Sequence, residues 1–218
     1  MIEDFDKNLF KKCMPFFGDS PVIFDIGAHK GSYTDFVKEV LPSAKCYLFE
    51  PNIDLYAKLK NKYEIVYPLA ICESTGFKTF HVCPKKNDEL SSLYKRSIFD
   101  ETGYESIKVR CASVDSLSIQ HDLEQIDFIK IDVEGAEKDV IVGCAAMMHD
   151  KKIKFIQFEY GSTYLDAEIN FTDILKVSAV FGYKTYELVN NTLTEVTEAN
   201  FINDYRYSVF LLTYIKCS

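Results

Sequence analysis

The sequence of 218 residues lacks the patterns of a secreted or membrane-spanning protein. Its seven cysteines are scattered singly, with no C-x-x-C pair, and an odd number suits no closed set of disulfides. We interpret them as reduced thiols and expect a cytoplasmic protein. No basic stretch followed by an apolar run opens the chain, and the longest apolar run, Val209 to Ile215, is too short to cross a bilayer.

A clustered basic face is also missing, and the formal net charge is −8. Because proteins that bind nucleic acid neutralise phosphates with grouped Lys and Arg, we expect no nucleic-acid partner. There is no G-x-S-x-G elbow and no Cys-His signature, which disfavours nucleophilic hydrolysis. What is abundant is apolar material: 47% of residues are hydrophobic, including 14 Tyr and 17 Phe. Length and composition predict one α/β domain over residues 1–218.

Apolar runs and helix-like segments alternate along most of the chain, which is typical of a doubly wound sheet. The predicted strands are VIFDI after Pro21, Lys45 to Glu50, Glu64 to Ala70, IDFIKID and KFIQFE. The predicted helices are Tyr33 to Leu41, Ile53 to Asn61, Ala136 to Met148 and Phe171 to Phe181. The runs TYELV, TLTEV and SVFLLTYI near the C-terminus predict antiparallel edge strands.

Two segments fall outside this alternation. Residues 1–20 predict a short helix that caps the fold, with Phe5, Leu9 and Phe10 near helical spacing. Residues 71–115 predict a hairpin-like insertion, which either carries part of a pocket wall or is a plain surface excursion.

The first strand–helix turn contains the strongest local signal. Gly27 and Gly31 allow a sharp bend and a close approach of a ligand, and Asp25 ends the preceding strand. The turn lacks the G-x-G-x-x-G pattern of pyrophosphate binding, whereas Glu50 follows Gly31 by 19 positions, near the offset at which a carboxylate meets ribose hydroxyls. A ribose-containing ligand is therefore predicted. The alternatives are a purely structural turn and a capping role for Glu50.

With these segments in place, the sequence resembles the FkbM family of S-adenosylmethionine-dependent methyltransferases. The resemblance is carried by DIGAHKG at 25–31, FEPN at 49–52, IKIDVEGAE at 129–137 and QFEYG at 157–161. It runs from about Val22 to the GYKTYEL segment at 182–188.

The resemblance implies a class I, Rossmann-like methyltransferase fold: a seven-stranded, mostly parallel sheet with its last strand antiparallel and helices on both faces. It also implies O-methylation of a hydroxyl on a sugar, glycan or other small molecule, with S-adenosylmethionine as cofactor. Carried over by position, the cofactor residues would be Asp25, Gly27, Ala28 and Gly31 for the methionine half, Glu50 for the ribose, and Asn52 and Ala70 for the adenine side.

A hydroxyl acceptor must lose its proton, so carboxylates at the ends of central strands are the catalytic candidates. Asp132 and Glu159 follow neighbouring predicted strands, and as a pair they would provide a base or hold a divalent cation such as Mg²⁺. The alternative for Asp132 is a cofactor contact or a helix cap. Lys130 shares a strand face with Asp132 and is predicted to pair with Asp132 or Glu159.

Three further residues have open roles. His29 is either a base beside the cofactor or a polar loop residue. Glu134 is expected in the first turn of the following helix, although it could face the site. Glu137 is interpreted as a helix residue or a tie within the loop.

Two other functions stay open on the sequence alone. A nicotinamide-dependent oxidoreductase would use the same ribose carboxylate, although the G-x-G-x-x-G pattern is missing. A catalytically silent Rossmann-fold binding protein is the other. The sequence identifies neither the acceptor nor the oligomeric state.

Overall fold

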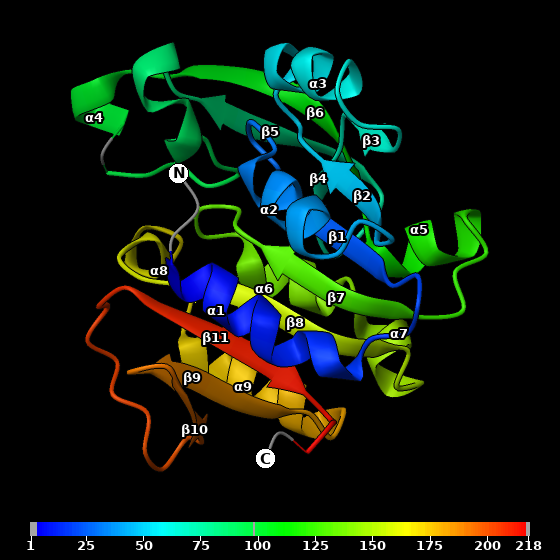
Figure 1. The fold of residues 1–218 in the computed structure, drawn as a ribbon. Coiled ribbons are helices and arrows are strands. Elements are labelled where there is room, and N and C mark those ends of the chain that lie inside the picture. The colour runs from blue at the N-terminus through cyan, green and yellow to red at the C-terminus, as the bar shows by residue number, and fades with distance from the viewer. Residues whose placement is uncertain (1–3, 98, 217–218) are drawn as a thin grey trace.

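The structure is a computed structural model that describes residues 4–97 and 99–216. Two sheets organise the chain (Figure 1). The large sheet comprises β1 (Val22–Ile26), β2 (Lys45–Phe49), β3 (Val66–Tyr67), β7 (Ile126–Ile131), β8 (Ile153–Tyr160), β9 (Lys184–Val189), β10 (Thr192–Val196) and β11 (Ser208–Thr213). The small sheet comprises β4 (Ala70–Ile71), β5 (Gly76–Val82) and β6 (Glu105–Ala112).

Helical segments connect these strands. They are α1 (Asp4–Cys13), η1 (Met14–Phe16), α2 (Ser32–Val40), α3 (Ile53–Lys60), η2 (Lys85–Leu90), α4 (Phe99–Thr102), α5 (Val114–Gln120), α6 (Glu137–Val142), α7 (Ala145–His149), α8 (Thr163–Asp166) and α9 (Phe171–Val180). The predicted α/β class is confirmed.

The large sheet has the order β10-β9-β11-β8-β7-β1-β2-β3. Strands β3, β2, β1, β7 and β8 are parallel, and β11 pairs antiparallel with both β8 and β9. The antiparallel last strand is therefore confirmed, but the described sheet has eight strands instead of seven. The eighth, β10, forms a hairpin with β9 through Asn190 and Asn191, which both have positive φ as a two-residue turn of this kind requires.

Adjacent residues of the central strands bury opposite faces. Phe128 packs in the core on the side of α1 and α2, whereas Ile129 packs on the side of α5, α6 and α9. This period of two is what a parallel strand covered on both faces requires. In Figure 1, α1 lies across β8 and β11 on the near side, and α6 and α9 lie behind the sheet. Leu9 and Phe10 fix α1 to the sheet, while Phe5 is exposed, so the predicted capping helix buries only part of its apolar face.

The predicted single strand from Glu64 to Ala70 is wrong. Residues 66–67 join the large sheet, and residues 70–71 join the small one. Pro68 lies between them, and because proline has no N–H to donate, it interrupts the ladder at the point where the chain changes sheets.

The predicted continuous helix from Ala136 to Met148 is also wrong, because it divides into α6 and α7 at Gly143. A Cβ at Gly143 would lie 2.2 Å from the carbonyl oxygen of Cys72, so the chain passes this point without a side chain. The Asp115 carboxylate then accepts the backbone N–H groups of Ala146 and Met147 at 2.8 and 3.0 Å. It thereby caps the first turn of the second helix.

The insertion folds beside the carboxyl ends of the parallel strands. Its strands β5 and β6 form an antiparallel hairpin, and β4 completes the small sheet in the order β4-β6-β5. Figure 1 shows this sheet as a separate layer beyond β1, with η2 and α4 in its connections. The hairpin is as predicted, and it places η2 over the first strand–helix turn.

Six cysteines of the described chain are free and buried, whereas Cys217 lies outside the described residues. Across residues 4–97 and 99–216, every helix is too short or too polar to cross a membrane.

Candidate active site

The turn between β1 and α2 is fixed by the protein itself. Gly27 has a φ of 76°, and a Cβ there would lie 1.8 Å from the backbone oxygen of Asp132. Gly31 has a φ of 80°, and a Cβ there would lie 2.5 Å from the hydroxyl of Tyr63. Both glycines are therefore required by backbone conformation and by close packing. Of the two glycines, Gly27 lines a cavity, whereas Gly31 does not, so a close approach of a ligand stays a prediction for Gly27.

Glu50 lies at the end of β2 and points back at this turn. Its two carboxylate oxygens accept the backbone N–H groups of His29 at 2.8 Å and Asn52 at 2.9 Å. Burial raises its pKa to about 7, although the two N–H donors oppose the shift. Each carboxylate oxygen has a second lone pair, so Glu50 can still accept hydrogen bonds from a ligand.

A cavity of about 680 Å³, open to solvent, begins at this carboxylate. Its polar lining includes Gly27, His29, Glu50, Asp132 and Glu134, and its apolar lining includes Phe49, Leu55, Leu69, Ala70 and Ile71. The insertion contributes Phe80, Asp88, Glu89, Ser91 and Leu93. The insertion is therefore a wall of this cavity and not a plain surface excursion.

Lys130 connects the first turn to the end of β7. Its ammonium lies 3.1 Å from Asp132 and 3.5 Å from Asp25, and it donates to the carbonyl of Gly27 at 3.1 Å. Burial lowers the pKa of Lys130, but Asp132, Asp25 and Glu159 together raise it above its ordinary value. The predicted pairing of Lys130 with Asp132 is confirmed.

A second cavity of about 550 Å³ adjoins the first and shares Asp132 and Glu134 with it. Its lining also includes Glu159, Tyr160, Thr163, Tyr205 and Tyr207. Asp132 and Glu159 meet here because β7 and β8 are parallel neighbours, with Ile131 opposite Phe158. Burial raises the pKa of Glu159 well above its ordinary value, and repulsion from Asp132 adds to this.

Glu134 lies in the loop before α6, so its expected place in the first turn of that helix is wrong. Its φ is 57°, and its side chain faces both cavities. Arg96 from the insertion contacts this carboxylate at 2.5 Å, and the Arg96 side chain is only 9% exposed. The Glu134 carbonyl also accepts the Ser92 hydroxyl at 2.8 Å. The insertion is thus attached to the loop that separates the two cavities.

Glu137 closes that loop. Its carboxylate accepts the backbone N–H groups of Gly135 and Val133 at 3.1–3.2 Å, and only 2% of the residue is exposed. Of its two predicted roles, the loop tie matches these contacts.

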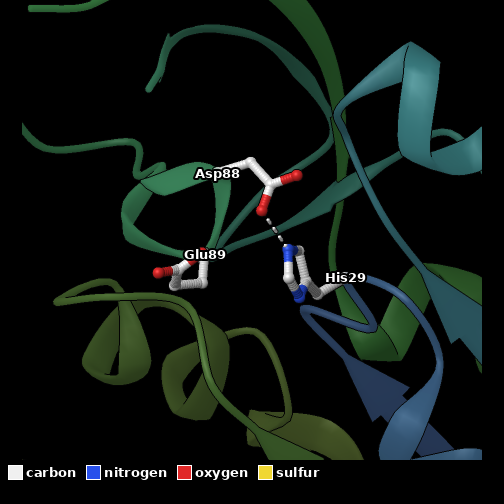
Figure 2. Close-up of side chains that lie close together, drawn as sticks. All are labelled: His29, Asp88 and Glu89. Atoms are coloured by element: carbon white, nitrogen blue, oxygen red, sulfur yellow. Dashed lines mark hydrogen bonds and ion pairs between the residues drawn. The ribbon is translucent and has the colours of Figure 1, made fainter. Parts of the chain in front are cut away.

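His29 has a φ of 49°, and its imidazole faces the insertion (Figure 2). Its Nε2 lies 2.7 Å from Oδ1 of Asp88, which also contacts the Lys30 ammonium at 2.9 Å. The imidazole thus meets η2, the part of the insertion that walls the first cavity.

Comparison with known proteins agrees with this geometry. Residues 25–185 match the Methyltransferase FkbM domain. The chain belongs to the FkbM methyltransferase family. It is 29% identical over 160 residues to the 2-O-methyltransferase NoeI of Sinorhizobium fredii, a match that covers 66% of this chain and 65% of that relative.

Among solved structures, a methyltransferase FkbM from Methylobacillus flagellatus aligns with a TM-score of 0.57 and 15% identity. The alignment covers 96% of this chain and 48% of the other, so the chain spans about half the length of that protein. This likeness shows a shared class I methyltransferase fold.

The structure separates the predicted site residues into three groups. Gly27, His29, Glu50, Ala70 and Asp132 line the first cavity, and Asp132 and Glu159 line the second. The four others line neither of these two cavities. Asp25 is fully buried and accepts the Thr34 hydroxyl. Ala28 and Gly31 form hydrogen bonds through their backbone, and Asn52 caps α3.

The sequence reasoning missed Arg96 and Asp88, which come from a segment without a regular pattern. For Arg96 a signal existed, because it is one of only three arginines in the chain and it lies next to a serine- and leucine-rich run. Asp88 gave no such signal.

Proposed function

We propose that this protein transfers the methyl group of S-adenosylmethionine to a hydroxyl of a sugar, a glycan or another small molecule. Membership of the FkbM family supports methyl transfer, and the relative named as a 2-O-methyltransferase supports oxygen as the acceptor atom. The observation that carries the proposal is the pair of adjoining cavities that share Asp132 and Glu134.

The first cavity fits an adenosyl ligand. Glu50 presents a buried carboxylate with free lone pairs, as ribose hydroxyls require, and the apolar lining around Leu69 and Ala70 suits a flat base. When bound, the cofactor supplies a methyl group already activated on a sulfonium. The protein then has to align the acceptor, exclude water and remove one proton.

The second cavity is where we place the acceptor. Glu159 and Asp132 are the candidate bases, and Asp132 is held by Lys130. Because repulsion and burial keep the proton on Glu159 at neutral pH, its basic form becomes available as the pH rises. The tyrosines of this cavity, Tyr160, Tyr205 and Tyr207, would pack against the acceptor.

The sequence also allowed Mg²⁺ at Asp132 and Glu159. The Lys130 ammonium at 3.1 Å from Asp132 already supplies positive charge at this place. We therefore favour a carboxylate base over a divalent cation at this pair. Activity of the metal-free protein should then be the same with and without added Mg²⁺, and a strict need for Mg²⁺ would contradict this assignment.

The test of the function combines binding and turnover. Calorimetric titration of the protein with S-adenosylhomocysteine should give one site per chain, whereas NADH should not bind. Transfer of labelled methyl from S-adenosylmethionine to a panel of sugars, oligosaccharides and small alcohols should then identify the acceptor. Tight NADH binding without S-adenosylhomocysteine binding would favour the oxidoreductase. Cofactor binding without transfer to any acceptor would favour a silent binding protein.

The site of action that fits this chemistry is the cytoplasm, where S-adenosylmethionine and reduced thiols coexist. The six free, buried cysteines support this location.

A further inference from the structure

The contact between the first turn and the insertion brings together three side chains with metal-binding atoms (Figure 2). One ligand atom each from His29, Asp88 and Glu89 lies within 4.8 Å of the others. Within residues 4–97 and 99–216, this is the one group of three or more such residues that comes so close. A lysine ammonium contacts a carboxylate at this group and at the Asp132–Glu159 pair, but Lys130 at that pair is buried, whereas Lys30 at this group is half-exposed.

The three ligands come from two parts of the chain. His29 belongs to the β1–α2 turn, and its backbone N–H is held by Glu50. Asp88 and Glu89 belong to η2 of the insertion, and all three residues line the first cavity. An ion shared by them would connect η2 to the turn at the mouth of that cavity.

We propose that His29, Asp88 and Glu89 form a binding site for a divalent transition metal of the Zn²⁺ type, which fastens the insertion over the first cavity. One imidazole nitrogen with two carboxylate oxygens suits Zn²⁺, whereas Mg²⁺ prefers oxygen ligands and its own water. Ligand atoms around a tetrahedral Zn²⁺ lie roughly 3.3 Å apart, given bonds of about 2.0 Å. The three atoms lie within 4.8 Å of one another, so their separations exceed this spacing by at most about 1.5 Å.

Lys30 gives the proposal a specific signature. Its ammonium contacts Oδ1 of Asp88 at 2.9 Å, and 52% of its side chain is exposed. This ammonium competes with a cation for the same carboxylate, but an exposed ion pair costs little to break. Binding of the metal displaces Lys30, so removal of the lysine charge should strengthen metal binding.

The experiment measures Zn²⁺ affinity directly. The metal-free full chain is titrated with Zn²⁺ against a chromophoric chelator, and Mg²⁺ is tested separately. We expect one Zn²⁺ per chain. Affinity for Zn²⁺ should fall about 10–100-fold or more in each ligand variant: His29→Gln, Asp88→Asn and Glu89→Gln. The loss of a metal ligand should cost at least as much affinity as the loss of a residue that hydrogen-bonds to a ligand. Lys30→Met should bind several-fold tighter, and Glu105→Gln, an exposed carboxylate elsewhere in the insertion, should match the wild type.

Hydrogen exchange provides the second measurement. Zn²⁺ should slow exchange of the amides in residues 85–90 in the wild type and leave them unchanged in Asp88→Asn. A cooperative urea transition and a far-ultraviolet circular dichroism spectrum like those of the wild type would show that each metal-free ligand variant is folded. The proposal is overturned if no stoichiometric Zn²⁺ binds, or if the three ligand variants bind it as the wild type does, as they would if the cysteines held the ion.

Binding of the metal does not depend on the proposed methyl transfer, whereas its effect on cofactor exchange rests on that function. If the site is present, Zn²⁺ should slow release of S-adenosylhomocysteine in the wild type but not in Asp88→Asn. Failure of the metal to bind and failure of S-adenosylhomocysteine to bind are separate results. The two proposals are therefore tested independently.

Discussion

The two cavities surround a buried carboxylate with different neighbouring groups. In the first, Glu50 is surrounded by donors, because the backbone N–H groups of His29 and Asn52 both face it. In the second, Glu159 lies beside Asp132, whose repulsion adds to the effect of burial, so its pKa is raised further above its ordinary value. A carboxylate that accepts hydrogen bonds from fixed donors suits recognition of a ligand. A carboxyl group with a strongly raised pKa suits proton transfer.

The largest expected effect comes from Glu159. Replacement by Gln should reduce kcat by about 10²–10⁴-fold, the usual contribution of a positioned base. Affinity for S-adenosylhomocysteine should be unchanged, because Glu159 does not line the first cavity. In the wild type, activity should rise with pH as Glu159 loses its proton. Asp132→Asn should move this rise to lower pH by removing the repulsion, and a pH profile of kcat that stays in place would argue against the pair.

The next effect concerns Lys130, which connects the two regions. Lys130→Met leaves Asp25 and Asp132 without their cation, and loss of one partner from a buried pair costs about 3–5 kcal/mol. Urea denaturation would measure this loss. Lys154→Met, which breaks the Lys154–Asp127 pair outside the site, is the matched control. Unchanged stability and cofactor affinity in Lys130→Met would mean that the ion pair does not hold the site.

Glu50 provides the corresponding test of the first cavity. Glu50→Gln turns one acceptor into a donor that faces a backbone N–H, and each lost charged hydrogen bond is worth about 1.5–3 kcal/mol. Affinity for S-adenosylhomocysteine should therefore fall about 10–100-fold by calorimetry. Asp54→Asn, an exposed carboxylate on the adjacent helix, should bind as the wild type does.

The same carboxyl predicts a pH dependence. Its pKa of about 7 in the folded protein exceeds the ordinary value of 4.5, so the folded state retains the proton longer than the unfolded state. The contribution of Glu50 to stability of the ligand-free protein should therefore decrease as the pH rises from about 4.5 to about 7. Cofactor affinity should increase over the upper part of this range. In Glu50→Gln this increase should be absent, and the loss of stability should be smaller than in the wild type, because Glu137 contributes a similar loss.

The smallest effect is expected at Arg96, where the insertion meets the loop between the cavities. Arg96→Lys keeps the charge but loses the planar contact with Glu134, which should cost about 1 kcal/mol in unfolding free energy. Arg110→Lys on the exposed side of β6 is the control. If the loss disappears when Glu134 is first changed to Gln, the contact between the two side chains accounts for it. A loss that persists in the Glu134→Gln background would place the effect elsewhere.

The two regions also differ in how far the sequence predicts them. Strands β1, β2 and β7 are continuous apolar runs, and residues at their ends, such as Glu50 and Asp132, could be located from spacing alone. The insertion was predictable only as a hairpin, because short polar segments such as η2 carry no period that fixes their direction. Arg96 and Asp88 reach the site through contacts between residues 38 and 59 positions apart. The break of the predicted helix at Gly143 likewise depends on a distant carbonyl, that of Cys72.

The carbonyl of Asp132 occupies the space that a side chain at position 27 would need. The bend that lines the first cavity and the strand end that carries a candidate base are therefore in direct contact. A side chain added at position 27 would therefore require the backbone at the end of β7 to move. Under the proposed function, substitutions that admit a different acceptor are therefore expected in the insertion and in the segment between β8 and β11.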